Sequence, residues 1–197
     1  MKRALFGGTF DPPHLAHTQL AALAVAEVGL DEVIFLPCHQ SPHKPGRPQA
    51  SDQDRLEMLN LATQGLPWAK VSDWELQRLQ RSYSWETAEH FAAAAPREPL
   101  FWILGMDQWQ TLETWSHPEK LKGLLTFIVL ARGGQVPELK PGWRGIFLHG
   151  EIPGSGTRIR ELLTTDGEAH RFLAPEVLNF IQQKQLYRSS GREKSNS

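Results

Sequence analysis

Six short apolar runs alternate with helical patterns along this chain, and that alternation constrains the fold more than any other feature. Each run is apolar throughout, which is typical of strands buried on both faces of a sheet. Strands separated by helices predict a parallel sheet covered on both sides, and right-handed crossovers then give a doubly wound α/β fold. The predicted strands span 3–8, 32–38, 69–74, 100–105, 126–132 and 146–150, and the predicted helices span 15–28, 52–64, 84–95, 107–121, 156–164 and 175–184.

Three of the predicted helices carry start signals. Ser51 or Asp52 can cap the second helix and Ser84 the third, because short polar side chains accept hydrogen bonds from the free N–H groups of a first turn. Pro175 stands where the first turn of the last helix would begin, a position that suits proline.

The composition predicts a globular protein with no general affinity for nucleic acid or membranes. The 197 residues suit one domain, predicted over 1–188, followed by a frayed polar tail at 189–197. A net charge of −1 predicts no attraction to nucleic acid or to an anionic membrane surface. A single cysteine, Cys38, excludes an internal disulfide and fits a reducing compartment. Neither a secretory signal nor a membrane-length apolar run is expected, so the predicted location is cytoplasmic.

The stretch GGTFDPPHLAH, residues 7–17, lies where the first strand passes into the first helix. In doubly wound folds, ligands bind at the carboxyl ends of the strands. Gly7 and Gly8 are expected to let a ligand approach the backbone closely. His14 and His17 lie three residues apart at the helix start and therefore share one face, where the helix N-terminus favours phosphate. The stretch predicts a phosphate site that uses imidazole donors.

Other phosphate-binding schemes do not match this sequence. The dinucleotide fingerprint needs G-x-G-x-x-G, a spacing that the stretch at 7–17 lacks. The motif G-x-x-x-x-G-K-[ST] occurs nowhere in the chain, which argues against a Walker-type ATPase.

The same stretch resembles the GGxFDPxHxGH signature of the H-x-G-H nucleotidyltransferases. That resemblance implies transfer of a nucleotidyl group from ATP or CTP to a phosphate, with release of pyrophosphate. Ala16 stands at the usual glycine, where the nucleotide base packs closely. Its extra methyl group is expected to be tolerated, and the sequence leaves open whether it shifts the base or weakens binding.

Six further segments resemble the nicotinate-mononucleotide adenylyltransferases within that group, in order and at compatible spacings. In GSGTRIRE, glycines replace the Ile and second Ser of the family's ISSTxIR pattern. The segments are SPHKP (41–45), RSYSWET (81–87), ILGMDQWQTLETW (103–115), FIVLARGG (127–134), GSGTRIRE (154–161) and FIQQKQLYR (180–188).

The resemblance implies a set of site residues, with His14 and His17 as the catalytic pair. Trp115 would stack on the pyridine ring of the acceptor. The implied ATP-binding residues are Gly7, Gly8, Thr9, Phe10, His14, His17, Gly105, Asp107, Arg132, Ser155, Thr157 and Arg160. The implied mononucleotide-binding residues are His43, Lys44, Arg55, Ser84, Asp107 and Trp115.

The implied reaction joins ATP and nicotinate mononucleotide into deamido-NAD and pyrophosphate, a step of NAD biosynthesis. Mg²⁺ is expected to arrive with ATP, because no dense carboxylate cluster marks a metal site built by the protein alone. Nicotinamide mononucleotide or phosphopantetheine remains an alternative acceptor, and a nucleotide-binding regulator without catalysis is an alternative from another class. The sequence leaves the oligomeric state open, a homo-oligomer included.

Overall fold

A computed structural model describes residues 1–42, 46–78, 81–131, 137–150, 152–165 and 167–188. Its centre is a six-stranded sheet in the order β3-β2-β1-β4-β5-β6, in which every pairing is parallel. This arrangement confirms the doubly wound α/β fold. The strands are β1 (Arg3–Gly8), β2 (Glu32–Pro37), β3 (Ala69–Val71), β4 (Leu100–Gly105), β5 (Leu125–Ala131) and β6 (Gly145–His149).

The strand order reverses direction beside β1, which pairs with β2 on one side and with β4 on the other. From β1 the chain builds the sheet outward through β2 and β3, then returns to place β4 on the opposite side. Such a reversal opens a crevice beyond the carboxyl ends of the central strands. The stretch at 7–17 therefore lies where this fold class binds ligands.

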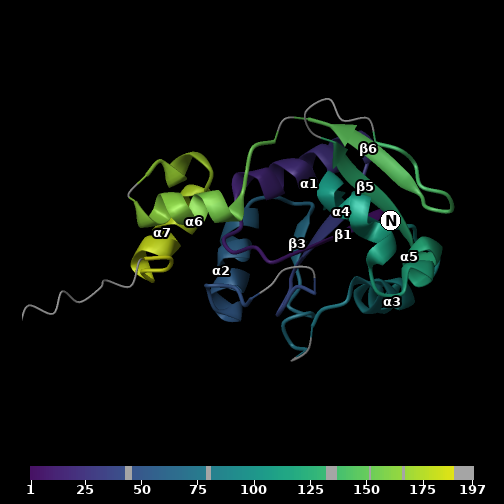
Figure 1. Ribbon diagram of the computed structural model, residues 1–197, viewed down its shortest axis with the longest axis horizontal. Coiled ribbons are helices and arrows are strands. Elements are labelled where there is room, and N and C mark those ends of the chain that lie inside the picture. Colours follow the sequence, from purple (N-terminus) through teal and green to yellow (C-terminus); the bar gives the residue numbers. More distant parts are fainter. Residues whose placement is uncertain (43–45, 79–80, 132–136, 151, 166, 189–197) are drawn as a thin grey trace, which may run out of the picture.

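Helices cover both faces of the sheet (Figure 1). Alternate residues of β1 point to opposite faces, as in any strand. Phe6 packs in the core beneath α1 (Leu15–Val28) and α2 (Asp52–Thr63), whereas Leu5 packs beneath α3 (Ser84–Ala94), α4 (Met106–Thr111) and α5 (Pro118–Leu124). No helix in the described part of the chain has the length and apolar character that a bilayer crossing requires.

The C-terminal helices form a third core of their own against α2. Here α6 (Gly156–Thr164), the short 3₁₀ turn η2 (Ala169–Arg171) and α7 (Pro175–Gln183) pack beside α2, at one end of the molecule in Figure 1. Ile159, Val177 and Ile181 fill this core with Met58 of α2. The C-terminal segment is thereby held near the first helix and its preceding loop.

The helix expected over 107–121 is interrupted, so that prediction is wrong in detail. It divides into α4, the 3₁₀ turn η1 (Leu112–Thr114) and α5. Trp115 is extended, and His117 has a left-handed backbone with φ 52°. Because Pro118 disfavours a helical conformation at the residue before it, the chain leaves the helix here and restarts with Pro118 at the first turn.

Two of the expected helix starts are confirmed, and the third is wrong. Ser51 caps α2 by accepting the Asp54 N–H at 3.1 Å, and Pro175 opens α7. The cap position of α3 is held by Tyr83, so Ser84 is the first helical residue instead.

Candidate active site

Two histidines open helix α1 at the carboxyl end of β1. His14 immediately precedes the helix with extended backbone (φ −138°, ψ 166°), and His17 lies in the first turn. Their rings stack with centroids 3.7 Å apart and planes 24° apart. Both imidazoles therefore lie together at the helix start, where the helix dipole favours a phosphate.

The hydrogen bonding of His17 assigns its tautomer. The backbone N–H of His14 donates to His17 Nδ1 at 3.1 Å. In a neutral imidazole an accepting Nδ1 leaves the proton on Nε2, so Nε2–H is a donor. The ring is fixed by edge-on contacts to Phe10 and Phe6, with centroids 4.9 and 5.9 Å away. His17 is thus a preorganised donor.

The two glycines of the turn make room for aromatic rings. A Cβ on Gly7 would lie 2.8 Å from the Trp102 ring, and one on Gly8 would lie 3.1 Å from the Phe10 ring. Phe10 itself is buried with a left-handed backbone (φ 49°). The close approach expected for a ligand is here made by the protein's own rings, so packing alone accounts for both glycines.

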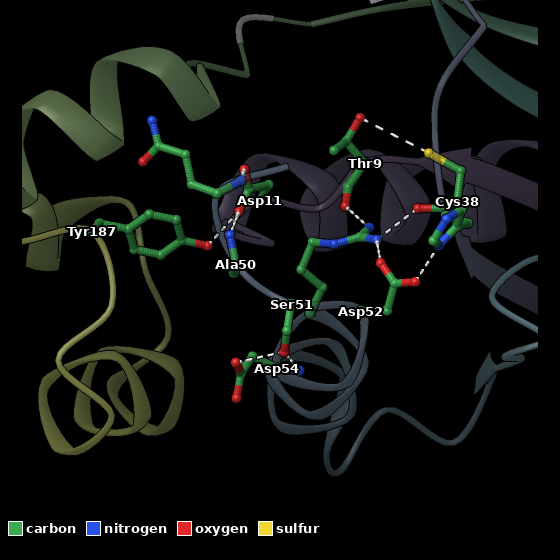
Figure 2. A network of polar contacts seen from close by, with 11 residues as sticks. Thr9, Asp11, Cys38, Ala50, Ser51, Asp52, Asp54 and Tyr187 are labelled. Carbon is green, nitrogen blue, oxygen red and sulfur yellow. Dashed lines mark hydrogen bonds and ion pairs between the residues drawn. The ribbon is translucent and has the colours of Figure 1, made fainter. Parts of the chain in front are cut away.

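Asp11 joins the loop before His14 to three other segments, and Figure 2 shows its contacts with Ala50 and Tyr187. Its carboxylate accepts the backbone N–H groups of Gln49 and Ala50 at 2.8 and 3.1 Å and the Tyr187 hydroxyl at 2.7 Å. Its backbone carbonyl accepts Arg160 Nη1 at 2.7 Å. Burial, and then the neighbouring Asp11 carboxylate, raise the pKa of Tyr187 well above its usual value, so the phenol stays protonated.

We expect Tyr187→Phe to lower the free energy of unfolding by about 1.5–3 kcal/mol, the range for a hydrogen bond to a charged group. The substitution removes only the hydroxyl that donates to the buried Asp11 carboxylate. Urea denaturation followed by fluorescence measures the change. Thr164→Val, which removes an exposed hydroxyl from α6, is the control and should change stability by less than about 0.5 kcal/mol. Equal stabilities for wild type and Tyr187→Phe would contradict the role of this contact.

Arg55 has a structural position that sequence reasoning did not predict. Its side chain has no exposed surface. The guanidinium donates to the carbonyls of Thr9 at 2.6 Å and Cys38 at 2.7 Å, and to Asp52 Oδ1 at 2.6 Å. Asp52 also pairs with His39. Figure 2 shows Thr9, Cys38 and Asp52 gathered around the network of these contacts. In the structure Arg55 ties together the loops that follow β1 and β2, and its binding of the mononucleotide stays a prediction.

A cavity of about 350 Å³ lies at the segment that precedes α3 and at the break after η1. Trp115, which is 5% exposed, and Ser84 both belong to its wall, so the structure brings these two predicted residues together. Its volume suits a small ligand rather than a macromolecule. The lining residues are Pro42, Arg81, Tyr83, Ser84, Thr114, Trp115 and Ser116.

The loop before α6 passes directly over the histidine pair. A Cβ on Gly154 would lie 2.5 Å from the Ala16 Cβ and 2.8 Å from His14 Cε1. Only a glycine fits there, because the methyl group of Ala16 and the His14 ring already occupy the space. Two of the departures from the family pattern, Ala16 and Gly154, would therefore be in contact with each other if Gly154 carried a Cβ, and only glycine avoids that clash.

The remaining predicted ATP residues lie on two helix starts. Ser155 and Thr157 are exposed at the start of α6, where Arg160 Nη2 donates to the Thr157 hydroxyl at 3.3 Å. Gly105 ends β4, and a Cβ on it would meet nothing within 4 Å. Asp107 is exposed in the first turn of α4. Gly105 and Asp107 thus lie at the carboxyl edge of the sheet, whereas Ser155, Thr157 and Arg160 lie at the start of the helix that packs against α2 and α7.

Three predicted residues, His43, Lys44 and Arg132, lie outside the described residues. Sequence reasoning in turn missed Asp11 and Tyr187 as site-building residues. Asp11 belongs to the FDP triplet and Tyr187 to the closing LY dipeptide, and these motifs were the available signals. No local sequence pattern predicts that two residues so far apart in the chain are hydrogen-bonded.

A parallel doubly wound sheet with paired histidines at the first helix start is the framework of a nucleotidyltransferase. A family model described as cytidylyltransferase-like matches residues 5–162. A protein named "Probable nicotinate-nucleotide adenylyltransferase" from Listeria welshimeri is 33% identical over 94% of this chain and 97% of its own length. One of the same name from Shouchella clausii is 35% identical over 95% and 97%. The chain belongs to the nicotinate-nucleotide adenylyltransferases of the cytidylyltransferase-like family.

Solved structures agree on the fold. The Plasmodium falciparum nicotinic acid mononucleotide adenylyltransferase complexed with NaAD has a TM-score of 0.78 to this chain. The match covers 95% of this chain and 98% of that one at 17% identity. A nicotinate-nucleotide adenylyltransferase structure from Vibrio parahaemolyticus has a TM-score of 0.69 with 18% identity, over 96% and 98% of the two chains.

Proposed function

We propose that this protein transfers the adenylyl group of ATP to nicotinate mononucleotide, giving deamido-NAD and pyrophosphate in NAD biosynthesis. A phosphate oxygen of the mononucleotide attacks the α-phosphorus of ATP in line. The new P–O bond forms as the bond from the α-phosphorus to the bridging oxygen of pyrophosphate breaks. Since the acceptor supplies the nucleophile, no covalent enzyme intermediate is needed, and catalysis consists of positioning and charge stabilisation.

The stacked histidine pair at the start of α1 is the observation that carries this proposal. Negative charge builds on the phosphate oxygens during transfer, and preorganised donors stabilise such charge without reorganisation. His17 has its donor proton assigned to Nε2 by the backbone of His14, and its ring is held by two phenylalanines. His14 and His17 would contact the transferring phosphate at the positive end of the α1 dipole.

The cavity bounded by Ser84 and Trp115 would hold the mononucleotide. Trp115 offers an aromatic wall for the pyridine ring, and aromatic faces are common stacking partners for planar heterocycles. Among the described residues that line it, Arg81 is the one that carries a charge, and a cation suits an acceptor that carries a carboxylate and a phosphate. Ser84 would meet the carboxylate end of the ring, and Asp107 would meet a ribose hydroxyl.

The triphosphate would lie between the starts of α1 and α6. Ser155 and Thr157 present hydroxyls there, and Arg160 adds a positive charge. Lys44, His43 and Arg132 complete the proposed set. No group of three or more His, Cys, Asp or Glu side chains in the described part of the chain could hold a metal ion. We therefore propose that Mg²⁺ is held chiefly by the ATP phosphates, whose charge it would neutralise.

We expect the acid mononucleotide to be the better acceptor, with a higher kcat/KM than its amide. Incubation with ATP and Mg²⁺ plus each acceptor, followed by chromatographic separation of deamido-NAD from NAD, measures both efficiencies. A pantetheine phosphate acceptor serves as the unrelated control and should yield no adenylylated product. A higher kcat/KM with the amide would overturn the acceptor assignment while leaving the transferase class intact.

A further inference from the structure

A buried carboxyl group lies behind the proposed acceptor cavity. Glu75 belongs to the turn that follows β3 and is only 3% exposed. Its Oε1 accepts the hydroxyl of Thr87 at 2.7 Å, and Thr87 in the first turns of α3 has no exposed surface. Burying an acid costs free energy unless hydrogen bonds or ion pairs compensate it, and the reaction proposed above does not use this carboxyl group.

The contacts of Glu75 fall on the segment that forms one wall of the cavity. Tyr83 and Ser84 line the cavity, with the buried Ser82 just before them and Thr87 just after. Thr87 is bonded to Tyr83 as well, through its N–H to the Tyr83 carbonyl at 3.3 Å. The Ser82 hydroxyl faces the Glu75 carboxyl closely enough to lower its pKa, although it lies outside hydrogen-bonding geometry.

The groups around Glu75 only partly offset the effect of burial on its pKa. Burial raises its pKa to about 6, while Thr87, Ser82 and Arg78 lower it and Glu86 raises it slightly. Arg78 is already paired with Glu86 at 2.9 Å. The same turn carries Asp73, which accepts the Gln77 side chain at 2.9 Å, and Trp74, on which the ring of His90 stacks.

The direction of this shift has a consequence for stability. Because the folded pKa lies above the ordinary value of 4.5, the folded state binds a proton here more tightly than the unfolded state does. The contribution of Glu75 to stability is therefore largest below pH 4.5 and falls as the pH rises to about 6. Above that window Glu75 is ionised and accepts the stronger, charge-assisted hydrogen bond from Thr87.

We propose that Glu75 is a positioning residue that holds residues 82–87 as a wall of the acceptor cavity, an inference that rests on the proposed function. Removing its carboxyl should loosen Tyr83 and Ser84 without disturbing the histidine pair. The Michaelis constant for the acceptor would then rise while the constant for ATP would not. A residue that served only global stability would change neither constant in the surviving folded enzyme.

The test compares Glu75→Ala, Glu75→Gln and Thr87→Val with the control Glu57→Gln, an exposed acid on α2. At pH 8 we expect Glu75→Ala and Thr87→Val to raise the acceptor KM about tenfold, the effect of losing one charged hydrogen bond. The ATP KM should stay within about twofold in each. Glu75→Gln keeps an acceptor oxygen, so it should match wild type at pH 5 and show a higher acceptor KM at pH 8. Titration calorimetry with nicotinate mononucleotide alone should give the same order of affinities.

The outcomes separate this inference from the proposed function. Trp115→Ala, on the opposite wall of the cavity, should raise the acceptor KM whether or not Glu75 has this role. An acceptor KM unchanged in Glu75→Ala and Thr87→Val but raised in Trp115→Ala would overturn the inference alone. Equal increases in the acceptor and ATP constants would also overturn it. A wild-type protein that binds no mononucleotide and forms no product would overturn both proposals.

Discussion

Replacing His17 with alanine is expected to lower kcat by about a hundred- to a thousandfold, the usual cost of one preorganised donor. The imidazole would stabilise charge that develops on the transferring phosphate, so the ATP KM should change only modestly. His14→Ala should behave similarly. The double variant should lose less than the product of the single losses, because both rings act on one group. Steady-state kinetics with nicotinate mononucleotide measures all three.

The control for this experiment is His170→Ala, an exposed histidine of η2 outside the site. It should retain nearly full turnover. Loss of the His17 side chain also removes the acceptor for the His14 N–H, so a modest fall in melting temperature is expected alongside the kinetic effect. Lowered melting temperatures with near-normal kcat in both single variants would show that the histidines are structural.

Replacing Arg55 with alanine is expected to lower the free energy of unfolding by about 3 kcal/mol or more, because two backbone carbonyls would lose their donor and each such loss costs about 1–3 kcal/mol. The buried guanidinium would no longer donate to the carbonyls of Thr9 and Cys38, whereas the half-exposed Asp52 carboxylate would keep His39 as its partner. At about 2–4 °C per kcal/mol, the melting temperature should fall by about 6 °C or more. Urea denaturation and calorimetry measure both quantities.

Two further variants show which property of the Arg55 side chain stabilises the fold. Arg55→Lys keeps the positive charge but loses the fork that reaches three acceptors, so an intermediate loss of stability is expected. Arg158→Ala, an exposed arginine on α6, should change stability by less than about 0.5 kcal/mol. A stability of Arg55→Ala equal to that of wild type, combined with far weaker binding of the mononucleotide, would instead support the predicted ligand-binding role of Arg55.

The sheet was readable from the sequence because its signal is local. Strand β1 and helix α1 have the predicted bounds, since each apolar run and each helical pattern carries its own periodicity. The break before Pro118 was missed because the pattern over 107–121 stays helical in composition. The restriction that a proline places on its preceding residue, His117, decided the outcome.

The site was predictable only where its residues share one motif. His14 and His17 are three residues apart, so their proximity follows from helix geometry. Gly7 has to be a glycine because the ring of Trp102 occupies the space of a Cβ. Asp11 accepts a hydrogen bond from the hydroxyl of Tyr187, which lies 176 residues further along the chain. Such partners depend on the whole topology. A single domain over 1–188, a cytoplasmic location and any homo-oligomer stay predictions.

A single-turnover reaction tests the central claim most directly. The protein is mixed in excess with nicotinate mononucleotide, Mg²⁺ and ATP that carries radioactive phosphorus at the α position, and all labelled species are separated at short times. Direct transfer at the histidine pair predicts that the label moves from ATP into deamido-NAD and that no label is bound to the protein. The unlabelled pyrophosphate, measured separately, should equal the deamido-NAD formed. His17→Ala should slow this step. Label held covalently on the protein, or no labelled deamido-NAD at all, would contradict the account.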